Sequence, residues 1–164
     1  NITGGVLQPV GYTLQDGRAV LEDNSIQRVL DLASRADIVF LGMGALAFCE
    51  PGTLFYEIIL AAGSSPKQLR ENYGAVGDIL FQLLDKEGNL IQDSPLEKKF
   101  KNCSINPEIL KRMGNPELQK PVVILSSGAR RAEAILAGLR GGYLNTVLID
   151  HHLGQELLSL DERV

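Results

Sequence analysis

The chain has 164 residues, of which 45% are hydrophobic and 22% are charged. These values are ordinary for one folded globular domain, and they exclude an extended disordered chain or a coiled coil. The net charge of −4 argues against non-specific binding of nucleic acid by this chain, and no run of about 20 apolar residues is present to span a membrane.

The first elements that the sequence predicts are a helix and a buried strand. Residues 25–36 (SIQRVLDLASRA) carry apolar side chains at helical spacing, after a capping Asn24 or Ser25. Residues 37–42 (DIVFLG) form a short apolar run that ends in glycine, which is typical of a central parallel strand. The segment 42–53 that follows is rich in glycine and small residues and is expected to be a loop.

The middle of the chain predicts a helix, two strands and a second short helix. Residues 64–73 begin with serines and Pro66, as helices often do. Residues 74–91 are consistent with two strands joined by a hairpin turn at residues 86–89 (KEGN). Residues 106–108 (NPE) combine a capping residue with a proline and so start another short helix.

The last third of the chain predicts a strand–helix–strand unit and a final helix. Its parts are a strand at 121–125, a turn at 126–129, a helix at 130–140, a strand at 145–150 and a helix that ends near Leu160. This alternation predicts an α/β domain with a Rossmann-like, mostly parallel sheet flanked by helices. The loops 42–48, 126–129 and 150–152 follow the carboxyl ends of predicted strands, where ligands bind in such sheets, and they could converge on one crevice.

The turn at residues 126–129 (SSGA) is the first candidate site. Small residues let a ligand approach the backbone, and the N-terminus of the following helix attracts anions. Arg131 could add a forked contact to a phosphate. A plain strand-to-helix turn with surface arginines explains the same residues equally well, because the segment contains neither a Walker A loop nor a GxGxxG fingerprint.

Three further features are candidates, each with an ordinary structural alternative. Asp78, in GAVGDIL, can accept hydrogen bonds from sugar hydroxyls, but aspartate also simply starts strands. His151 and His152 follow Asp150 at a predicted strand end, yet a helix cap and first turn is the more ordinary interpretation. The segment 42–44 (GMG) allows close approach to its backbone or forms a common turn. No GxSxG motif is present, so we predict no catalytic residue.

The cysteines and the N-terminus set the remaining expectations. Cys49 and Cys103 form no CxxC pair, so we expect free thiols in a reducing cytoplasm and neither a metal site nor a cofactor. The first residues lack an initiating Met and the basic region of a secretory leader, and they resemble the end of a strand. We therefore expect residues 1–164 to be a single domain that is incomplete at its N-terminus.

Taken together and in order, these segments resemble a known family. RADIVFLGMGAL, GAVGDILFQLLDKEGNLI and VVILSSGARRAEAILAGLRGGYLNTVLIDHHLGQELL are similar to the effector-binding domain of SorC-type bacterial transcriptional regulators. The resemblance implies a fold like that of sugar-phosphate isomerases and deaminases. It also implies a sensor that binds a phosphorylated sugar and thereby alters operator binding, an N-terminal helix-turn-helix domain outside this chain, and self-association.

The resemblance also assigns candidate effector-binding residues. Asp78 matches the acidic residue of the family that contacts the sugar, Ser127 and Gly128 match its Gly-Gly turn, and Arg131 stands where a lysine usually reaches the ligand. The remaining matches are Gly42, Met43 and Gly44, together with Gly4 and Gly5.

Departures from the family pattern keep two alternatives open. The family's arginine near residues 53–57 is missing, and its phosphate-cradling loop is expected to lie before residue 1. One alternative is therefore a degenerate domain that keeps the fold for oligomerisation without a ligand. The other is an enzyme, a sugar-phosphate isomerase or deaminase, for which Asp78 and the two histidines are the only plausible bases.

Overall fold

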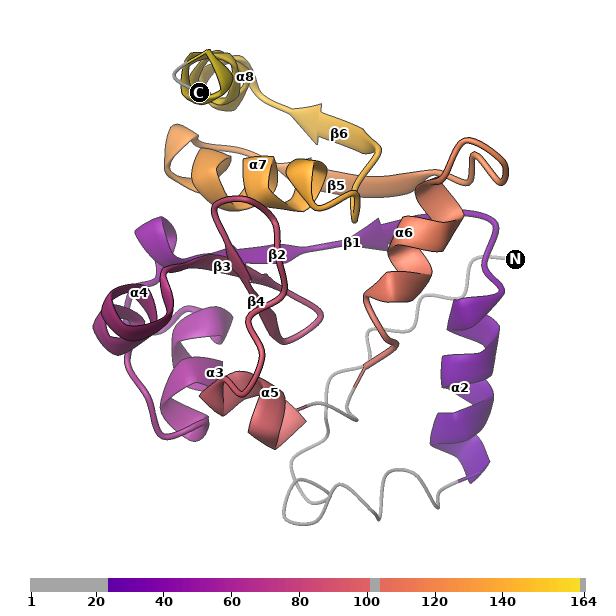
Figure 1. Ribbon diagram of the computed structural model, residues 1–164, viewed down its shortest axis with the longest axis horizontal. Helices are drawn as coiled ribbons and strands as arrows, with labels where there is room; N and C mark the ends of the chain where they lie inside the picture. Colours follow the sequence, from indigo (N-terminus) through magenta and orange to yellow (C-terminus); the bar gives the residue numbers. More distant parts are fainter. Residues whose placement is uncertain (1–23, 101–103, 163–164) are drawn as a thin grey trace.

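The computed structural model describes residues 24–100 and 104–162 of the chain (Figure 1). The elements, in chain order, are α2 (Asn24–Ser34), β1 (Val39–Leu41), β2 (Met43–Ala45), the 3-10 helix η1 (Leu46–Phe48), α3 (Leu54–Ala61), α4 (Pro66–Tyr73), β3 (Ala75–Ile79), β4 (Gln82–Asp85), α5 (Pro95–Phe100), α6 (Glu108–Gly114), β5 (Val122–Ser126), the 3-10 helix η2 (Ala129–Arg131), α7 (Ala132–Arg140), β6 (Thr146–Ile149) and α8 (His151–Asp161).

Three of the strands form a parallel sheet in the order β1–β5–β6. Leu41 of β1 lies opposite Ile124 of β5, and Leu125 of β5 lies opposite Leu148 of β6. Helix α7 connects β5 to β6, so the predicted strand–helix–strand unit is present. The prediction of an α/β fold with a parallel sheet and flanking helices is therefore confirmed.

A second, antiparallel sheet begins where the parallel sheet ends. Only Gly42 separates β1 from β2, and the second sheet has the order β2–β3–β4. The expectation of a plain loop over residues 42–53 is therefore wrong, since this segment contains a strand and a 3-10 helix. The sharp change of sheet at Gly42 places the backbone of Met43–Ala45 beside the ends of the parallel strands.

The hairpin turn between β3 and β4 is not where the sequence predicted it. Leu80 and Phe81 join the two strands, with φ of 51° and 66°. Residues 86–89, the predicted turn, form a second turn, after which Leu90 makes an isolated bridge to Leu84. Leu80 and Phe81 pack against different core clusters, so burial of both side chains outweighs the usual preference for glycine or asparagine at such turns.

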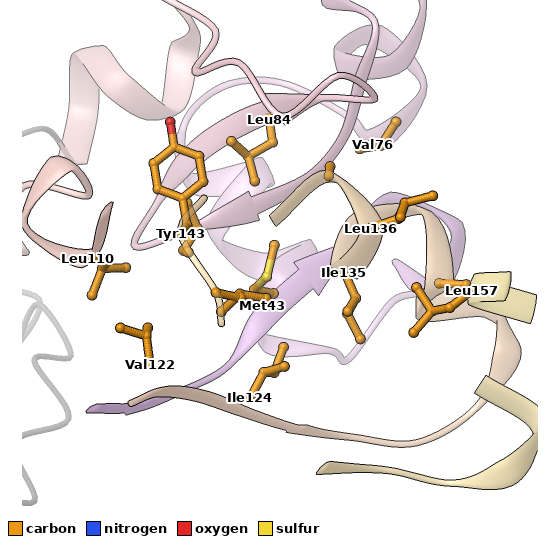
Figure 2. Close-up of a cluster of buried hydrophobic side chains, with 14 of the residues drawn as sticks. Met43, Val76, Leu84, Leu110, Val122, Ile124, Ile135, Leu136, Tyr143 and Leu157 are labelled. Carbon is orange, nitrogen blue, oxygen red and sulfur yellow. The ribbon is translucent and has the colours of Figure 1, made fainter. Parts of the chain in front are cut away.

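The buried side chains form two clusters. The first lies against the parallel sheet, one face of the antiparallel sheet and helices α6, α7 and α8, and Figure 2 shows many of its members, including Met43, Ile124 and Ile135. The second lies on the other face of the antiparallel sheet, with α3, α4 and α5. Helix α7 packs against all three antiparallel strands and against α8, and its side chains share the first cluster with those of the parallel sheet.

One face of the parallel sheet packs into the first core cluster. The side chains on this face are those of Val39, Leu41, Val122, Ile124, Val147 and Ile149. On the opposite face Val123 is buried, whereas Ile38, Phe40, Leu125 and Leu148 keep 44%, 62%, 59% and 54% of their surface exposed. Parallel sheets are usually covered on both faces, so this partly exposed apolar face is a notable surface of the described structure.

Two helices were not among the predicted elements. Thr53 caps α3 by accepting the N–H of Tyr56, and Ser94 lies before the six-residue α5 and accepts the N–H of Glu97. The predicted helix at 64–73 corresponds to α4, which Ser65 caps. The helices predicted at 25–36, at 106–108 and at the C-terminus correspond to α2, α6 and α8.

Candidate functional site

The loops that follow β1, β5 and β6 are in contact with one another, as expected from the sequence. Arg130 donates from Nε to the carbonyl of Ala47 (2.9 Å) and from Nη1 to Oε1 of Glu50 (2.6 Å). Gly128 donates its N–H to Oδ2 of Asp150 (2.7 Å). The three strand ends therefore form one candidate site, at which η1 and η2 are in contact.

Phe48 and two arginines form the first half of this site. The guanidinium carbon of Arg131 lies 4.5 Å from the centroid of the Phe48 ring, and that of Arg130 lies 5.4 Å from it. Glu50 pairs with Arg130, whereas Arg131 forms no ion pair with any described residue. Stacking fixes a guanidinium plane while its N–H edge stays available for a forked contact to a carboxylate or phosphate.

The turn at Gly128 forms the second half. Gly128 has a φ of 90°, and no atom lies within 4 Å of the position that a Cβ would take there. Its N–H is bonded to the carboxylate of Asp150, a partly exposed residue that also caps α8 by accepting the N–H of Leu153 (2.8 Å). The N–H of Leu153, and then that of Gly128, hold the pKa of Asp150 below its usual value.

Asp150 changes what the turn can bind. Because the N–H of Gly128 is already bonded to a carboxylate, a phosphate at that point would lose this donor and meet a negative charge. A hydroxyl group, in contrast, can donate to a carboxylate. The turn therefore suits the hydroxyls of a polar ligand, and Arg131 suits its anionic group.

Asp78 is buried and holds two backbone segments. Its Oδ1 accepts the N–H of Gly44 and its Oδ2 accepts the N–H of Phe81, each at 3.0 Å. Burial raises the pKa of Asp78 to about 6, against the opposing effect of the N–H groups of Phe81 and Gly44. A side chain at Gly44 would collide with the Asp78 carboxylate and with Phe55, so this glycine is required by close packing.

The other candidate residues are placed in different ways. Met43 points its side chain into the first core cluster, so only its backbone faces the strand ends (Figure 2). Gly42 has open space where a side chain would project. Gly4 and Gly5 lie outside the described residues. Ser127 is exposed in the turn beside Gly128.

Three further ionisable or nucleophilic side chains, those of His151, His152 and Cys49, follow the strand ends. His151 and His152 are exposed in the first turn of α8, with ring centroids 5.8 Å apart. Burial raises the pKa of the half-buried Cys49 thiol to about 11, so this thiol stays protonated at neutral pH. Among the described residues, no group of three or more histidine, cysteine, aspartate and glutamate side chains could hold a metal ion.

Three members of the site, Phe48, Glu50 and Arg130, were not among the residues predicted from the sequence. Phe48 follows a glycine-rich loop, and Arg130 precedes Arg131. The two segments are far apart in the sequence, since Arg130 bonds to the carbonyl of Ala47, 83 positions away. Only the sheet order brings these loops together, because β1 pairs directly with β5.

No helix among the residues that the structure describes has both the length and the apolar content to cross a membrane.

Comparisons with known proteins identify the family of the chain and its fold. The family model described as "Putative sugar-binding domain" matches residues 9–159. The transcriptional regulator LsrR of Escherichia coli O9:H4 (strain HS) is 28% identical over 142 residues, which cover 86% of this chain and 41% of LsrR. LsrR of Enterobacter sp. (strain 638) is 26% identical over 137 residues, which cover 83% of this chain and 39% of that protein. The chain thus spans about two fifths of the length of these relatives.

Solved structures show the same fold. The crystal structure of the "Putative Sugar-Binding Domain of Transcriptional Repressor" from Vibrio fischeri superimposes with a TM-score of 0.70 at 23% identity, covering 89% of this chain and 53% of the other. The full-length sorbitol operon regulator SorC from Klebsiella pneumoniae gives a TM-score of 0.68 at 19% identity, covering 86% and 42%. The chain belongs to the family of sugar-binding domains that SorC-type transcriptional regulators carry.

Proposed function

We propose that this domain is the effector sensor of a bacterial transcriptional regulator and that it binds a phosphorylated sugar where the three loops meet. Binding would alter how a helix-turn-helix domain, outside this chain, engages operator DNA. Relatives named as transcriptional regulators support the regulatory role, and the family match supports a sugar ligand. A role on operator DNA places the domain in the cytoplasm.

The observation that carries the proposal is that a cation, Arg131, and a carboxylate, Asp150, both belong to the loops that meet at this site. Arg131, whose guanidinium lies over the Phe48 ring, offers a cation and a forked set of donors. Asp150, held by two backbone N–H groups, offers a carboxylate that stays ionised. One end of the site therefore fits a phosphate and the other fits hydroxyls, the two kinds of group that a sugar phosphate combines.

The same contacts could transmit ligand binding at Arg131 to the loop that contains η1. Phe48 belongs to η1, which Arg130 ties to η2 through Ala47 and Glu50. A ligand that engages Arg131 would change the surroundings of Phe48 and so shift η1 relative to η2. We propose that this movement is the first step of the response to effector.

Isothermal titration against a panel of sugar phosphates tests the proposal, with the matching free sugars and inorganic phosphate as references. We expect Arg131→Ala to lower the affinity for the phosphorylated ligand about 10- to 100-fold, since a hydrogen bond to a charged group contributes about 1.5–3 kcal/mol. Arg131→Lys should keep part of this affinity, because the charge remains and the fork is lost. Arg112→Ala, an exposed arginine on α6, is the matched control and should bind normally.

Two results would count against the proposal. Unchanged affinity in Arg131→Ala would remove this arginine from the site. Failure of the folded protein to bind any member of the panel would favour the degenerate alternative, in which the fold serves oligomerisation alone.

The enzyme alternative has one observation in its favour. Burial raises the pKa of Asp78 to about 6, a value that suits a general base. Both of its carboxylate oxygens, however, already accept backbone N–H groups, which is the arrangement of a structural carboxylate. Turnover of the same panel, followed by loss of sugar phosphate, separates the two functions: a sensor binds its ligand and returns it unchanged.

A further inference from the structure

Arg130, the second arginine of the site, already has an anionic partner within the chain. Its Nη1 donates to Oε1 of Glu50 at 2.6 Å, and its Nε donates to the carbonyl of Ala47 at 2.9 Å. Carboxylate and phosphate groups are alike as partners for a guanidinium, since both are negatively charged and accept its forked hydrogen bonds. Glu50 therefore takes the place at Arg130 that the anionic group of a ligand would take.

The two arginines share one aromatic ring but differ in how their charge is balanced. The guanidinium carbons of Arg130 and Arg131 lie 5.4 Å and 4.5 Å from the centroid of the Phe48 ring. Among the described residues, Glu50 pairs with Arg130 and no carboxylate pairs with Arg131. The two arginines thus present one unbalanced positive charge while Glu50 is in place, and two after it leaves. A phosphate monoester carries about −1.5 to −2 at neutral pH, so its charge matches the second state.

The side chain of Glu50 can leave Arg130 without a change in its own backbone. The backbone carbonyl of Glu50 is held by the N–H of Thr53 at 3.0 Å and by the Thr53 hydroxyl at 2.8 Å. The side chains of Glu50 and Arg130 keep 56% and 58% of their surface exposed, and an exposed ion pair of this kind contributes little to stability. Rotation about the side-chain bonds of Glu50 is therefore enough to release the arginine.

We propose that Glu50 is an internal competitor of the ligand: it occupies Arg130 in the empty domain, and the anionic group of the ligand displaces it and binds Arg130 together with Arg131. The inference rests on the proposed function, because it concerns the phosphate end of the same site. Displacement breaks one of the two bonds by which Arg130 holds the η1 loop and leaves the bond to Ala47. Glu50 thereby lowers the affinity for the anion and links its binding to a loosening of this loop.

Calorimetric titration of the full chain with inorganic phosphate, at constant ionic strength, tests the competition. We expect Glu50→Gln to bind phosphate about 3- to 5-fold more tightly than the wild type, because phosphate no longer has to break an exposed ion pair. Loss of a merely structural contact would instead weaken binding. Glu57→Gln, which removes the same charge from an exposed position in the first turn of α3, is the matched control and should leave the affinity unchanged.

A double-mutant cycle separates displacement from simple repulsion between Glu50 and phosphate. In an Arg130→Ala background phosphate binds through Arg131 and Glu50 has no arginine to occupy, so Glu50→Gln should no longer raise the affinity. An equal gain with and without Arg130 would show that Glu50 acts by repulsion alone and would overturn the proposal. So would a wild-type affinity in Glu50→Gln, or the absence of phosphate binding in both proteins.

The outcomes for Arg131→Ala keep this inference apart from the proposed function. If Arg131→Ala weakens sugar-phosphate binding but Glu50→Gln does not strengthen phosphate binding, the proposed effector site stands and Glu50 is not its competitor. If Glu50→Gln strengthens phosphate binding but no sugar phosphate binds, the competition at Arg130 stands and the proposed effector is wrong.

Discussion

Asp78 accepts hydrogen bonds from two different backbone segments, the N–H of Gly44 in β2 and the N–H of Phe81 in the β3–β4 turn. These bonds fix the segment after Gly42 relative to the antiparallel sheet. Burial raises the pKa of this carboxyl from its ordinary 3.8 to about 6. The folded state therefore favours the protonated carboxyl of Asp78, and ionisation of this carboxyl makes folding less favourable.

This raised pKa predicts a specific dependence of stability on pH. Between about pH 4 and pH 6 the folded state binds more protons at Asp78 than the unfolded chain, so the contribution of Asp78 to the free energy of unfolding falls as pH rises. The difference of about 2 pH units corresponds to about 3 kcal/mol. The measurement is urea unfolding of wild type and Asp78→Asn across this range. The wild type should lose stability relative to the variant as pH rises, and parallel curves would contradict the raised pKa.

The individual site residues were predictable to different degrees. Arg131 and Gly128 stand out locally, because a small-residue turn before a helix is a recognisable signal. Phe48 and Glu50 carry no such signal, and they join the site only through contacts with η2. Met43 lies in the predicted loop, but its side chain is buried in the core. Spacing along the chain could not distinguish these outcomes, since they depend on the order of the strands.

At the scale of elements, the sequence predicted what local patterns determine. The β5–α7–β6 unit and the caps of α4 and α8 follow from short-range signals, and all are present. The turn at Leu80 and Phe81 does not follow from such signals, because both residues adopt a positive φ, which side chains of this kind disfavour. Their side chains pack on the two core clusters, a tertiary effect that no local rule contains.

The turn at Gly88 makes an element-scale prediction. Gly88 has a φ of 89°, and a Cβ there would collide with the backbone of Gly141 and the carbonyl of Ala137, at the end of α7. Gly88→Ala should therefore lower the free energy of unfolding by more than about 3 kcal/mol, from backbone strain and steric overlap together. Gly63→Ala, with a φ of 72° and open space around it, should cost only about 1 kcal/mol. Equal losses in urea unfolding would show that the turn can move away from α7.

At the scale of the whole molecule, the parallel sheet was predictable and the antiparallel sheet was only partly so. The parallel strands are continuous apolar runs, a pattern that indicates their class. The antiparallel sheet depends on a strand of three residues, Met43–Ala45, whose sequence MGA resembles a loop. It becomes a strand because Gly44 pairs with Asp78 and because α7 packs against its sheet.

Because α7 contacts the antiparallel strands and its side chains share the first core cluster with the parallel sheet, we predict that the two core clusters unfold as one unit. Leu83 is fully buried in the second cluster, and Leu83→Ala should cost about 2–5 kcal/mol. Hydrogen exchange should show this loss of protection both in β4, which carries Leu83, and in β5 of the first cluster. Leu118→Ala, at an exposed position, should change neither strand. Faster exchange confined to β4 would mean that the antiparallel sheet opens independently, and α7 would then not couple the two sheets.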